Sequence, residues 1–185
     1  MNFNFAQIPA FHQETNLANI IIDTPKGSRN KFKFDAEKKL FKLKHILPAG
    51  AVFPFDFGFL PNTLTEDGDP LDILILLEAP AFVGCLIETR ILGVLEAEQT
   101  DKNGQTERND RLIGVFAEDK RYEKTEDLRD LPPELLQEIE HFFRSYNEIR
   151  EIRFKVLASS GAKKALQIIQ KSVKLAEKSK QPNRK

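Results

Sequence analysis

The sequence predicts an α+β domain with a β-barrel core, and three observations carry this prediction. Short strand-like segments fill residues 20–117, two segments of helical periodicity follow them, and no internal repeat or low-complexity linker divides the chain. Short strands followed by late helices are typical of α+β domains and small barrels. The length of 185 residues suits one domain with a sizeable core, so we expect a single domain over residues 1–185.

The strands are expected where short apolar or alternating runs lie between turn residues. Lys31–Phe34 alternates strictly, which puts both of its lysines on one face of a strand, and residues 40–43 return as its hairpin partner. Residues 82–98 are expected to hold two strands bent at Gly93, and Asn103-Gly104 marks a turn in the polar segment after them. The remaining expected strands are residues 20–22, 73–77 and 111–117.

Two amphipathic helices are expected near the end of the chain. Pro132-Pro133 opens the first, whose apolar side chains recur at helical spacing over Leu135–Ile149. Gly161 precedes the second, whose apolar stripe covers Ala162–Ala176. The predicted organisation is an N-terminal arm over 1–19, barrel strands and active-site loops over 20–117, helices over 132–178 and a frayed tail over 179–185.

Composition argues against several classes of protein. Lys and Arg together number 28, as do Asp and Glu, and this zero net charge is not that of a generic nucleic-acid binder. No apolar run approaches the roughly 20 residues that span a membrane, and the first 25 residues lack the Lys and Arg of a leader peptide. Cys85 allows no intrachain disulfide and is expected to be a small core residue. We expect a cytoplasmic protein that binds neither nucleic acid nor membrane.

The most informative stretch is residues 53–77, FPFDFGFLPNTLTEDGDPLDILILL. Asp67, Asp69 and Asp72 crowd one tight turn, in which Gly68 can adopt the positive φ that such a turn needs. Three carboxylates this close repel one another, so water, basic side chains or a divalent cation must offset the repulsion. Asp72 opens the most apolar run of the chain, which is a rigid strand able to hold a ligand in place. Hard oxygen donors favour Mg²⁺, and a solvated Asp-Gly turn is the alternative.

Further residues around this turn extend the pattern. Residues 53–54 and 56–59 precede it, residues 25–31 lie upstream, and His141, Phe142, Phe143 and Tyr146 lie downstream. With D-G-D-P-x-D at residues 67–72, this pattern resembles the family I soluble inorganic pyrophosphatases, in order from Ile20 to Phe154. The resemblance implies a small closed five-stranded, OB-like β-barrel flanked by two C-terminal helices. It also implies Mg²⁺-dependent hydrolysis of inorganic pyrophosphate to two phosphates by metal-activated water, and a homo-oligomer, commonly a hexamer in bacterial members.

The resemblance also implies roles for the residues that match. Asp67 and Asp72 match ligands of Mg²⁺, and Asp69 matches the acid that helps to deprotonate the attacking water. Lys31 and Tyr146 match groups that bind phosphate. For Lys31 the structural alternative is a lysine on a wet strand face, and for Tyr146 it is a core tyrosine with its hydroxyl at the rim.

The match is less regular over residues 96–111, where the loop is longer than is usual in the family. Arg111 takes the place of a substrate-binding lysine, and one metal-ligand position falls on Asn109 with Asp110 beside it, so we assign Asp110 as the candidate metal ligand. Glu96 and Glu107 are expected on a charged surface. The second metal-ligand position of this segment has three candidates, which are Glu98, Gln99 and Asp101.

Several positions depart from the family pattern. His45 stands where an arginine grips phosphate, and we assign to it a weaker phosphate contact. Lys33 replaces a glutamate that helps to hold a further metal, which reverses the local charge. The other departures are Asp23 for glutamate, Phe53 and Phe57 for tyrosine, and Asn147 for lysine. They leave two alternatives open, which are a pyrophosphatase-fold protein with an altered phosphate substrate and a non-catalytic protein that binds phosphate or metal.

Overall fold

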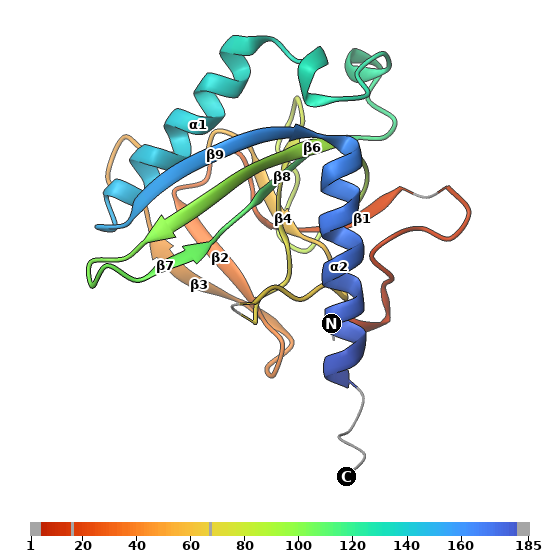
Figure 1. Ribbon diagram of the computed structural model, residues 1–185, viewed down its shortest axis with the longest axis horizontal. Coiled ribbons are helices and arrows are strands. Elements are labelled where there is room, and N and C mark those ends of the chain that lie inside the picture. The colour runs from red at the N-terminus through yellow and green to blue at the C-terminus, as the bar shows by residue number, and fades with distance from the viewer. Residues whose placement is uncertain (1–4, 16, 67, 181–185) are drawn as a thin grey trace.

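The computed structural model describes residues 5–15, 17–66 and 68–180, and it shows strands curled around a core with two helices packed outside them (Figure 1). The strands are β1 (Ala18–Thr24), β2 (Asn30–Asp35), β3 (Leu40–Ile46), β4 (Asp56–Phe59), β5 (Asp72–Leu76), β6 (Leu86–Thr100), β7 (Thr106–Arg108), β8 (Arg111–Phe116) and β9 (Arg153–Gly161). The helices are η1 (Phe5–Gln7), η2 (Lys120–Tyr122), η3 (Leu128–Asp130), α1 (Pro133–Glu148) and α2 (Ala162–Lys180).

Five strands of the described chain close into a ring. β1 pairs with β4, β4 with β5, β5 with β8, β8 with β6, and β6 returns to β1. Only the β5–β8 pair is parallel. Each of these strands therefore has a neighbour on both sides, as in a small barrel. The predicted α+β fold, a small closed five-stranded OB-like barrel flanked by two C-terminal helices, is confirmed.

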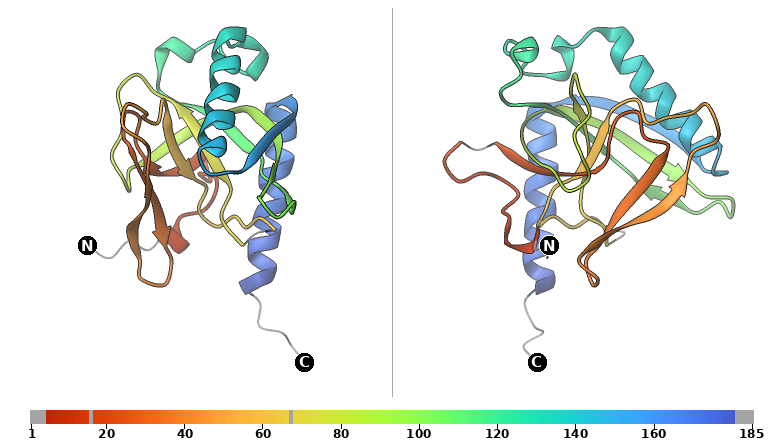
Figure 2. Two further views of the ribbon diagram at one scale, coloured as in Figure 1. Left: turned by 90° about the vertical axis from the view of Figure 1, so that its left-hand side faces the viewer. Right: turned by 180° about the vertical axis from the view of Figure 1, so that it is seen from behind.

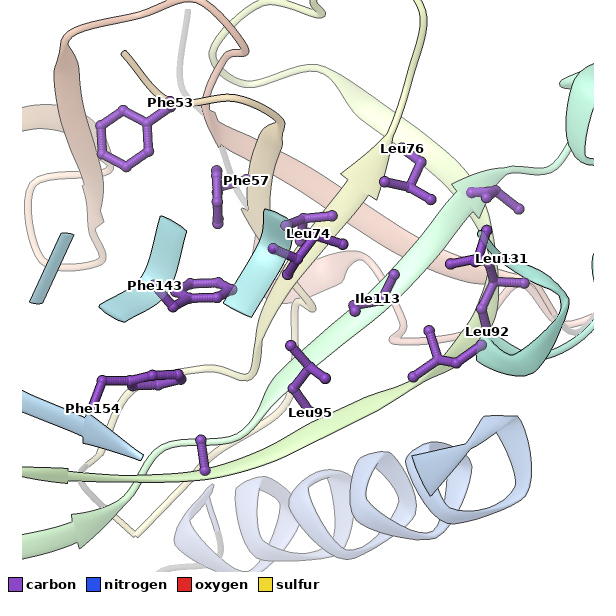
Figure 3. Close-up of a cluster of buried hydrophobic side chains, with 14 of the residues drawn as sticks. Phe53, Phe57, Leu74, Leu76, Leu92, Leu95, Ile113, Leu131, Phe143 and Phe154 are labelled. Carbon is purple, nitrogen blue, oxygen red and sulfur yellow. The ribbon is translucent and has the colours of Figure 1, made fainter. Parts of the chain in front are cut away.

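The apolar run of β5 is buried on both of its faces, which explains why it does not alternate with polar residues. Leu74 belongs to one core cluster, together with Ile113 of β8 and Phe143 of α1 (Figure 3). Ile73 faces the other cluster, which Ile169 of α2 completes. The two helices thus cover opposite side-chain sets of the same strand, and both begin where the sequence predicts.

The longest strand, β6, differs from the expectation. Its 15 residues form one continuous strand rather than two, with a register shift between Ile91 and Gly93 where it passes from one neighbour to the next. β9 pairs with β6 from Gly93 to Thr100 and was not predicted. The region expected to be helical over 132–178 is therefore a helix, a strand and a helix.

The β2–β3 hairpin forms a separate two-stranded sheet, and its predicted pairing is confirmed. Figure 2 shows the hairpin projecting on the side of the barrel away from α2. Phe34 and Phe41 of the hairpin pack against Phe5 and Phe59, with ring centroids between 4.7 and 6.1 Å apart. This aromatic cluster holds the hairpin against the barrel, where Lys31 and Lys33 reach Asp23 and Asp69.

Cys85 and the C-terminal end of the described chain were also subjects of sequence predictions. Cys85 is only partly buried and packs against the second core cluster. The helix α2 extends through Lys180, and the rest of the predicted tail lies outside the described residues. Among the residues that are described, no helix has the length and apolar character needed to cross a membrane.

Candidate active site

A cavity of about 520 Å³ lies between the barrel, the hairpin and α1, and its lining combines acids, bases and aromatic rings. It gathers residues that are far apart in the sequence. Of the predicted site residues, those that line this cavity are Lys31, His45, Asp69, Asp72, Asp110, Arg111 and Tyr146. The remaining predicted residue, Asp67, lies outside the described residues.

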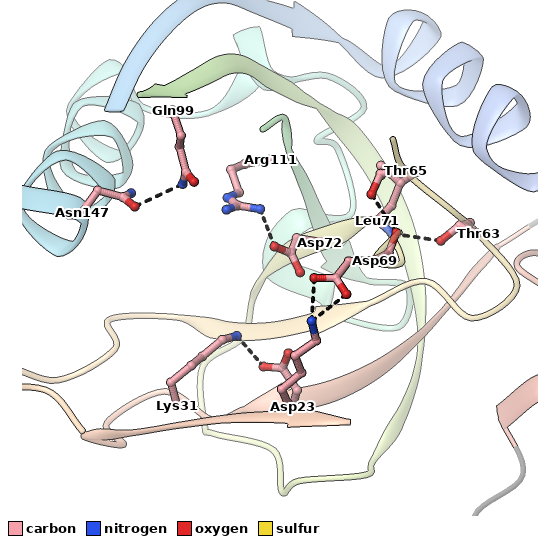
Figure 4. Close-up of polar contacts among 11 residues, drawn as sticks. Asp23, Lys31, Thr63, Thr65, Asp69, Leu71, Asp72, Gln99, Arg111 and Asn147 are labelled. Atoms are coloured by element: carbon pink, nitrogen blue, oxygen red, sulfur yellow. Dashed lines mark hydrogen bonds and ion pairs between the residues drawn. The ribbon is translucent and has the colours of Figure 1, made fainter. Parts of the chain in front are cut away.

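The acidic turn is closed by backbone bonds that do not involve its carboxylates. The backbone N–H and the hydroxyl of Thr65 both donate to the carbonyl oxygen of Asp69, at 2.8 and 2.7 Å. Gly68 has a φ of 84°, which a residue with a side chain adopts only under strain. The predicted tight turn is confirmed, and it leaves the carboxylate of Asp69 directed into the cavity (Figure 4).

The parallel pairing of β5 and β8 places Asp72 beside Arg111. Ile73 lies opposite Leu112, so the residue that opens each strand emerges at the same edge of the barrel. The Arg111 guanidinium binds the Asp72 carboxylate, and it also lies 5.5 Å from the ring centroid of Phe143. The Nε atom of Arg111 is buried without a hydrogen-bond partner among the described groups, so this cation retains a donor for a further acceptor.

Lys31 is held as a buried cation. Its ammonium lies 2.8 Å from Asp23 of β1 and 5.7 Å from the ring centroid of Phe57. Burial alone would lower the pKa of Lys31, but the carboxylates of Asp23 and Asp72 outweigh it and raise this pKa above its usual value. Lys31 therefore carries a full positive charge at neutral pH.

His45 and Tyr146 meet at the rim of the cavity. The hairpin register sets His45 opposite Lys31, and the Nε2 atom of His45 shares a 2.7 Å hydrogen bond with the Tyr146 hydroxyl. Burial raises the pKa of Tyr146, so its hydroxyl stays protonated. Burial, assisted by Arg150, lowers the pKa of His45 below 6.5, so its imidazole is neutral at physiological pH.

We expect His45 to make the protein less stable in mild acid. Its pKa in the folded protein lies below the unfolded value of 6.5, so the unfolded chain takes up the proton more readily as the pH falls. The stability that neutral His45 contributes is complete above that value and is lost as the pH drops through the lowered pKa. Urea unfolding of wild type and His45→Gln at about pH 7.5 and about pH 5.5 measures this loss, which should be smaller in the variant.

His141→Gln is the matched control, because His141 lies exposed on α1. It should lose as much stability between the two pH values as wild type does. An equal loss in wild type and His45→Gln would show that His45 does not titrate abnormally.

In the segment 96–111, the positions of the side chains distinguish among the three candidates for the second metal ligand. Gln99 lines the cavity, and its amide donates to Asn147 at 3.1 Å. Glu98 instead forms an ion pair with Lys155 at 3.3 Å, on the far side of β6. Asp101 accepts from the backbone of its own turn, at Asn103 and Gln105. Of the three candidates, only Gln99 reaches the cavity.

Asp110 lines the cavity, but its carboxylate is engaged in the fold. Its Oδ1 atom accepts from the backbone N–H of Ala97 at 3.0 Å and from Nε of Arg108 at 2.6 Å. Arg108 also binds Glu96 at 2.7 Å, and Glu96 accepts from the Ser160 hydroxyl. Glu96 and Glu107 both border the cavity. Glu107 is exposed on β7, as expected for a charged surface, whereas the Glu96 side chain is only 17% exposed.

The sequence reasoning missed several cations of this cavity. Arg150 lies 5.4 Å from the ring centroid of Tyr146. Its spacing of one helical turn after Tyr146 was the available signal. The other lining cations that were not assigned to the site are Lys44, Arg108, Lys164 and Lys171.

The donor set of the cavity fits a hard divalent cation. Asp69 and Asp72 offer carboxylate oxygens from side chains that are each 47% exposed, and the amide side chains of Gln99 and Asn109 also line the cavity. Within the described ranges, no cluster of three or more His, Cys, Asp or Glu side chains is arranged to hold a metal. A cation here would therefore depend on few carboxylates, supplemented by neutral oxygens.

Comparisons with known proteins agree with this geometry. Residues 20–177 match the family described as "Pyrophosphatase: Inorganic pyrophosphatase". The inorganic pyrophosphatase of Geobacillus stearothermophilus is 37% identical over 160 residues, which cover 86% of this chain and 94% of that protein. The crystal structure of inorganic pyrophosphatase from Thermus thermophilus superimposes with a TM-score of 0.85 at 33% identity, covering 95% of this chain and 99% of that one. An inorganic pyrophosphatase structure from Neisseria gonorrhoeae gives a TM-score of 0.83 at 31% identity, with 94% and 99% covered. With its fold and most of its length shared with these proteins, the chain belongs to the inorganic pyrophosphatase family.

Proposed function

We propose that the protein hydrolyses inorganic pyrophosphate to two orthophosphates and that it uses Mg²⁺ to do so. The observation that carries the proposal is the convergence of acids and bases on one cavity, which Asp69 and Asp72 line together with Lys31, Arg111 and Tyr146. Hydrolysis of a phosphoanhydride requires positive charge around the phosphate oxygens and a group that accepts a proton from water. Membership of the family supports the same activity and the use of a divalent metal.

The basic and hydroxyl groups bind the substrate in this proposal. Lys31 and Arg111 supply buried positive charge, and Arg111 presents its guanidinium in a fork that suits phosphate oxygens. The protonated Tyr146 hydroxyl donates a hydrogen bond, and the neutral His45 beside it donates at most one. These groups approach from β2, β3, β8 and α1, so they surround a small anion rather than line one side of it.

The acidic groups hold the metal and the proton. Asp72, Asp67 and Asp110 would hold Mg²⁺, which supplies charge to the phosphate oxygens and makes water more acidic. Asp69 accepts the proton of the attacking water at a carboxylate oxygen. A carboxylate has about four lone-pair sites, two on each oxygen, so contact of Lys33 with both oxygens does not by itself prevent Asp69 from accepting a proton.

A second candidate function is the non-catalytic binding of phosphate. The observation that favours it is the pairing of three carboxylates at or beside the cavity with bases, namely Asp23 with Lys31, Asp69 with Lys33 and Asp72 with Arg111. Such pairing would weaken the binding of a metal, because a cation must compete with the paired base. Phosphate would then bind without any hydrolysis, which the following measurement distinguishes.

Incubation of the protein with pyrophosphate and Mg²⁺ should release two orthophosphates for each pyrophosphate consumed. The release should fall to the uncatalysed rate when EDTA removes the metal and should return when Mg²⁺ is restored in excess. A colorimetric phosphate assay follows both steps. Binding of pyrophosphate without phosphate release, at any Mg²⁺ concentration, would exclude hydrolysis and leave the binding function.

We also propose a cytoplasmic homo-oligomer, a hexamer by family resemblance, that binds neither nucleic acid nor membrane. Exposed apolar side chains on the described surface support the association of copies, for example Phe82 at 69% and Ile46 at 57% exposure. Sedimentation equilibrium tests the hexamer as a mass of six chains of 21.2 kDa.

A further inference from the structure

The wall of the cavity that carries the acidic turn balances its charges within the chain (Figure 4). Lys31 pairs with Asp23, and Arg111 pairs with Asp72. Lys33 reaches from the hairpin to the turn, and its ammonium lies 2.5 and 2.6 Å from the two carboxylate oxygens of Asp69. Each of these three described acids, Asp23, Asp69 and Asp72, therefore has a base of its own.

The contact of Lys33 differs from the other two because its ammonium lies within hydrogen-bond distance of both oxygens of one carboxylate. Asp69 follows Lys33 by 36 residues, and β2 belongs to a sheet that is not part of the barrel ring. Both carboxylate oxygens face the same ammonium, so the base lies where it interacts with the whole charge of Asp69. The side chains of Lys33 and Asp69 are 34% and 47% exposed, so ions in solution can reach them.

We propose that Lys33 is a built-in counter-cation that competes with a divalent cation for Asp69, so that the protein binds such a cation only weakly on this wall. The inference deepens the proposed function and rests on it, because both place a divalent cation beside Asp69 and Asp72. It adds that part of the positive charge of the site comes from the chain itself.

The physical basis is competition and repulsion. A dication beside Asp69 must share the carboxylate with the ammonium or displace it, and displacement gives up a charge-assisted hydrogen bond on both oxygens. A dication that stays beside Asp72 still meets the positive charge of Lys33 at short range. Both effects weaken binding of the cation without any change in its oxygen donors.

Replacement of Lys33 by methionine should therefore tighten the binding of a divalent cation by about tenfold or more. Mn²⁺ is the probe, because it accepts the oxygen ligands that suit Mg²⁺ and its free form can be counted by electron paramagnetic resonance. Equilibrium titration of the protein without substrate gives the dissociation constant and the number of ions bound. This readout does not require hydrolysis.

Lys42→Met is the matched control. Lys42 lies directly opposite Lys33 in the hairpin register and pairs with Asp35 at 3.2 Å, away from the cavity. It removes the same charge from the same hairpin and should leave Mn²⁺ binding as in wild type. Lys33→Arg keeps the charge and should also bind as weakly as wild type, while Lys33→Gln repeats the neutral substitution should the methionine variant not fold.

Equal or weaker Mn²⁺ binding in the folded neutral variants, compared with wild type, would overturn the proposal, as would tighter binding in Lys42→Met. Tighter binding in the neutral variants with no phosphate release from any protein would sustain the inference while the proposed hydrolysis fails. Phosphate release by wild type with unchanged Mn²⁺ binding in the neutral variants would support the proposed hydrolysis and overturn the inference about Lys33.

Discussion

Asp69→Asn should lower the turnover of pyrophosphate by about 100-fold or more at saturating substrate and Mg²⁺, because the amide that replaces the carboxylate cannot accept a proton from water. The substitution preserves the size of the side chain. The turn itself should persist, since both bonds from Thr65 end on the backbone oxygen of residue 69. The measurement is the initial rate of phosphate release as a function of pyrophosphate concentration.

Glu78→Gln is the control for this substitution. It makes the same change from carboxylate to amide on a side chain that is 79% exposed and does not line the cavity, so its turnover should equal that of wild type. Urea unfolding of both variants shows that each is folded. Turnover of Asp69→Asn within about twofold of wild type would remove Asp69 from the reaction and transfer the proton to another group.

The ion pair with Lys33 adds a second way in which Asp69→Asn could act, and this way can be separated. The variant loses the carboxylate, but it also releases the ammonium of Lys33 from both oxygens. Lys33→Met releases the same ion pair and keeps the carboxylate. If proton acceptance by Asp69 is the dominant effect, turnover in Lys33→Met should remain well above that in Asp69→Asn.

The hydrophobic pattern of the sequence was sufficient to predict the strands and helices that bury a regular apolar face. The run that forms β5 was identified as a strand because it is buried on both faces, and α1 and α2 were identified from their apolar stripes. β9 carries no such signal. Most of its side chains are exposed, and it is held by pairing with β6, a strand more than fifty positions earlier in the sequence at Gly93↔Gly161.

In the candidate site, too, the sequence predicted what depends on local spacing but not the contacts between distant residues. Asp69 and Asp72 were found from a short motif, because their spacing around Gly68 is a local property. Lys33 and Arg111 were placed in the site through the family resemblance, but their ion pairs with these acids were not predicted. The partners lie 36 and 39 residues apart in the sequence and meet only through the closure of the ring and the docking of the hairpin.

The choice between Glu98 and Gln99, which the sequence left open, depends on which face of β6 meets the cavity. Gln99 shares a face of β6 with Ala97, which is fully buried, and this face turns toward the cavity, whereas Glu98 between them points to Lys155. Alternation alone gives two opposite faces, and only the three-dimensional structure tells which one meets the site.

Gly93→Ala should cause the largest loss of stability among single methyl additions considered for this fold, about 3 kcal/mol or more. A Cβ atom at Gly93 would lie 2.3 Å from the carbonyl oxygen of Ser160 and 2.6 Å from Cγ of Leu128. The first neighbour is backbone of β9, so the strand itself has to move. Gly93 lies at the register shift where β6 contacts β8 and β9 together, so the movement disturbs two ladders.

The contrast with Gly104→Ala separates steric overlap from backbone strain. Gly104 has a φ of 83° in an exposed turn with open space around its Cβ position, so alanine there should cost only about 1–2 kcal/mol. The free energy of unfolding in urea gives both values on one scale. If Gly93→Ala lost no more stability than Gly104→Ala, β9 would have to be free to shift on β6. The close approach of these two strands at Gly93 would then not be important for stability.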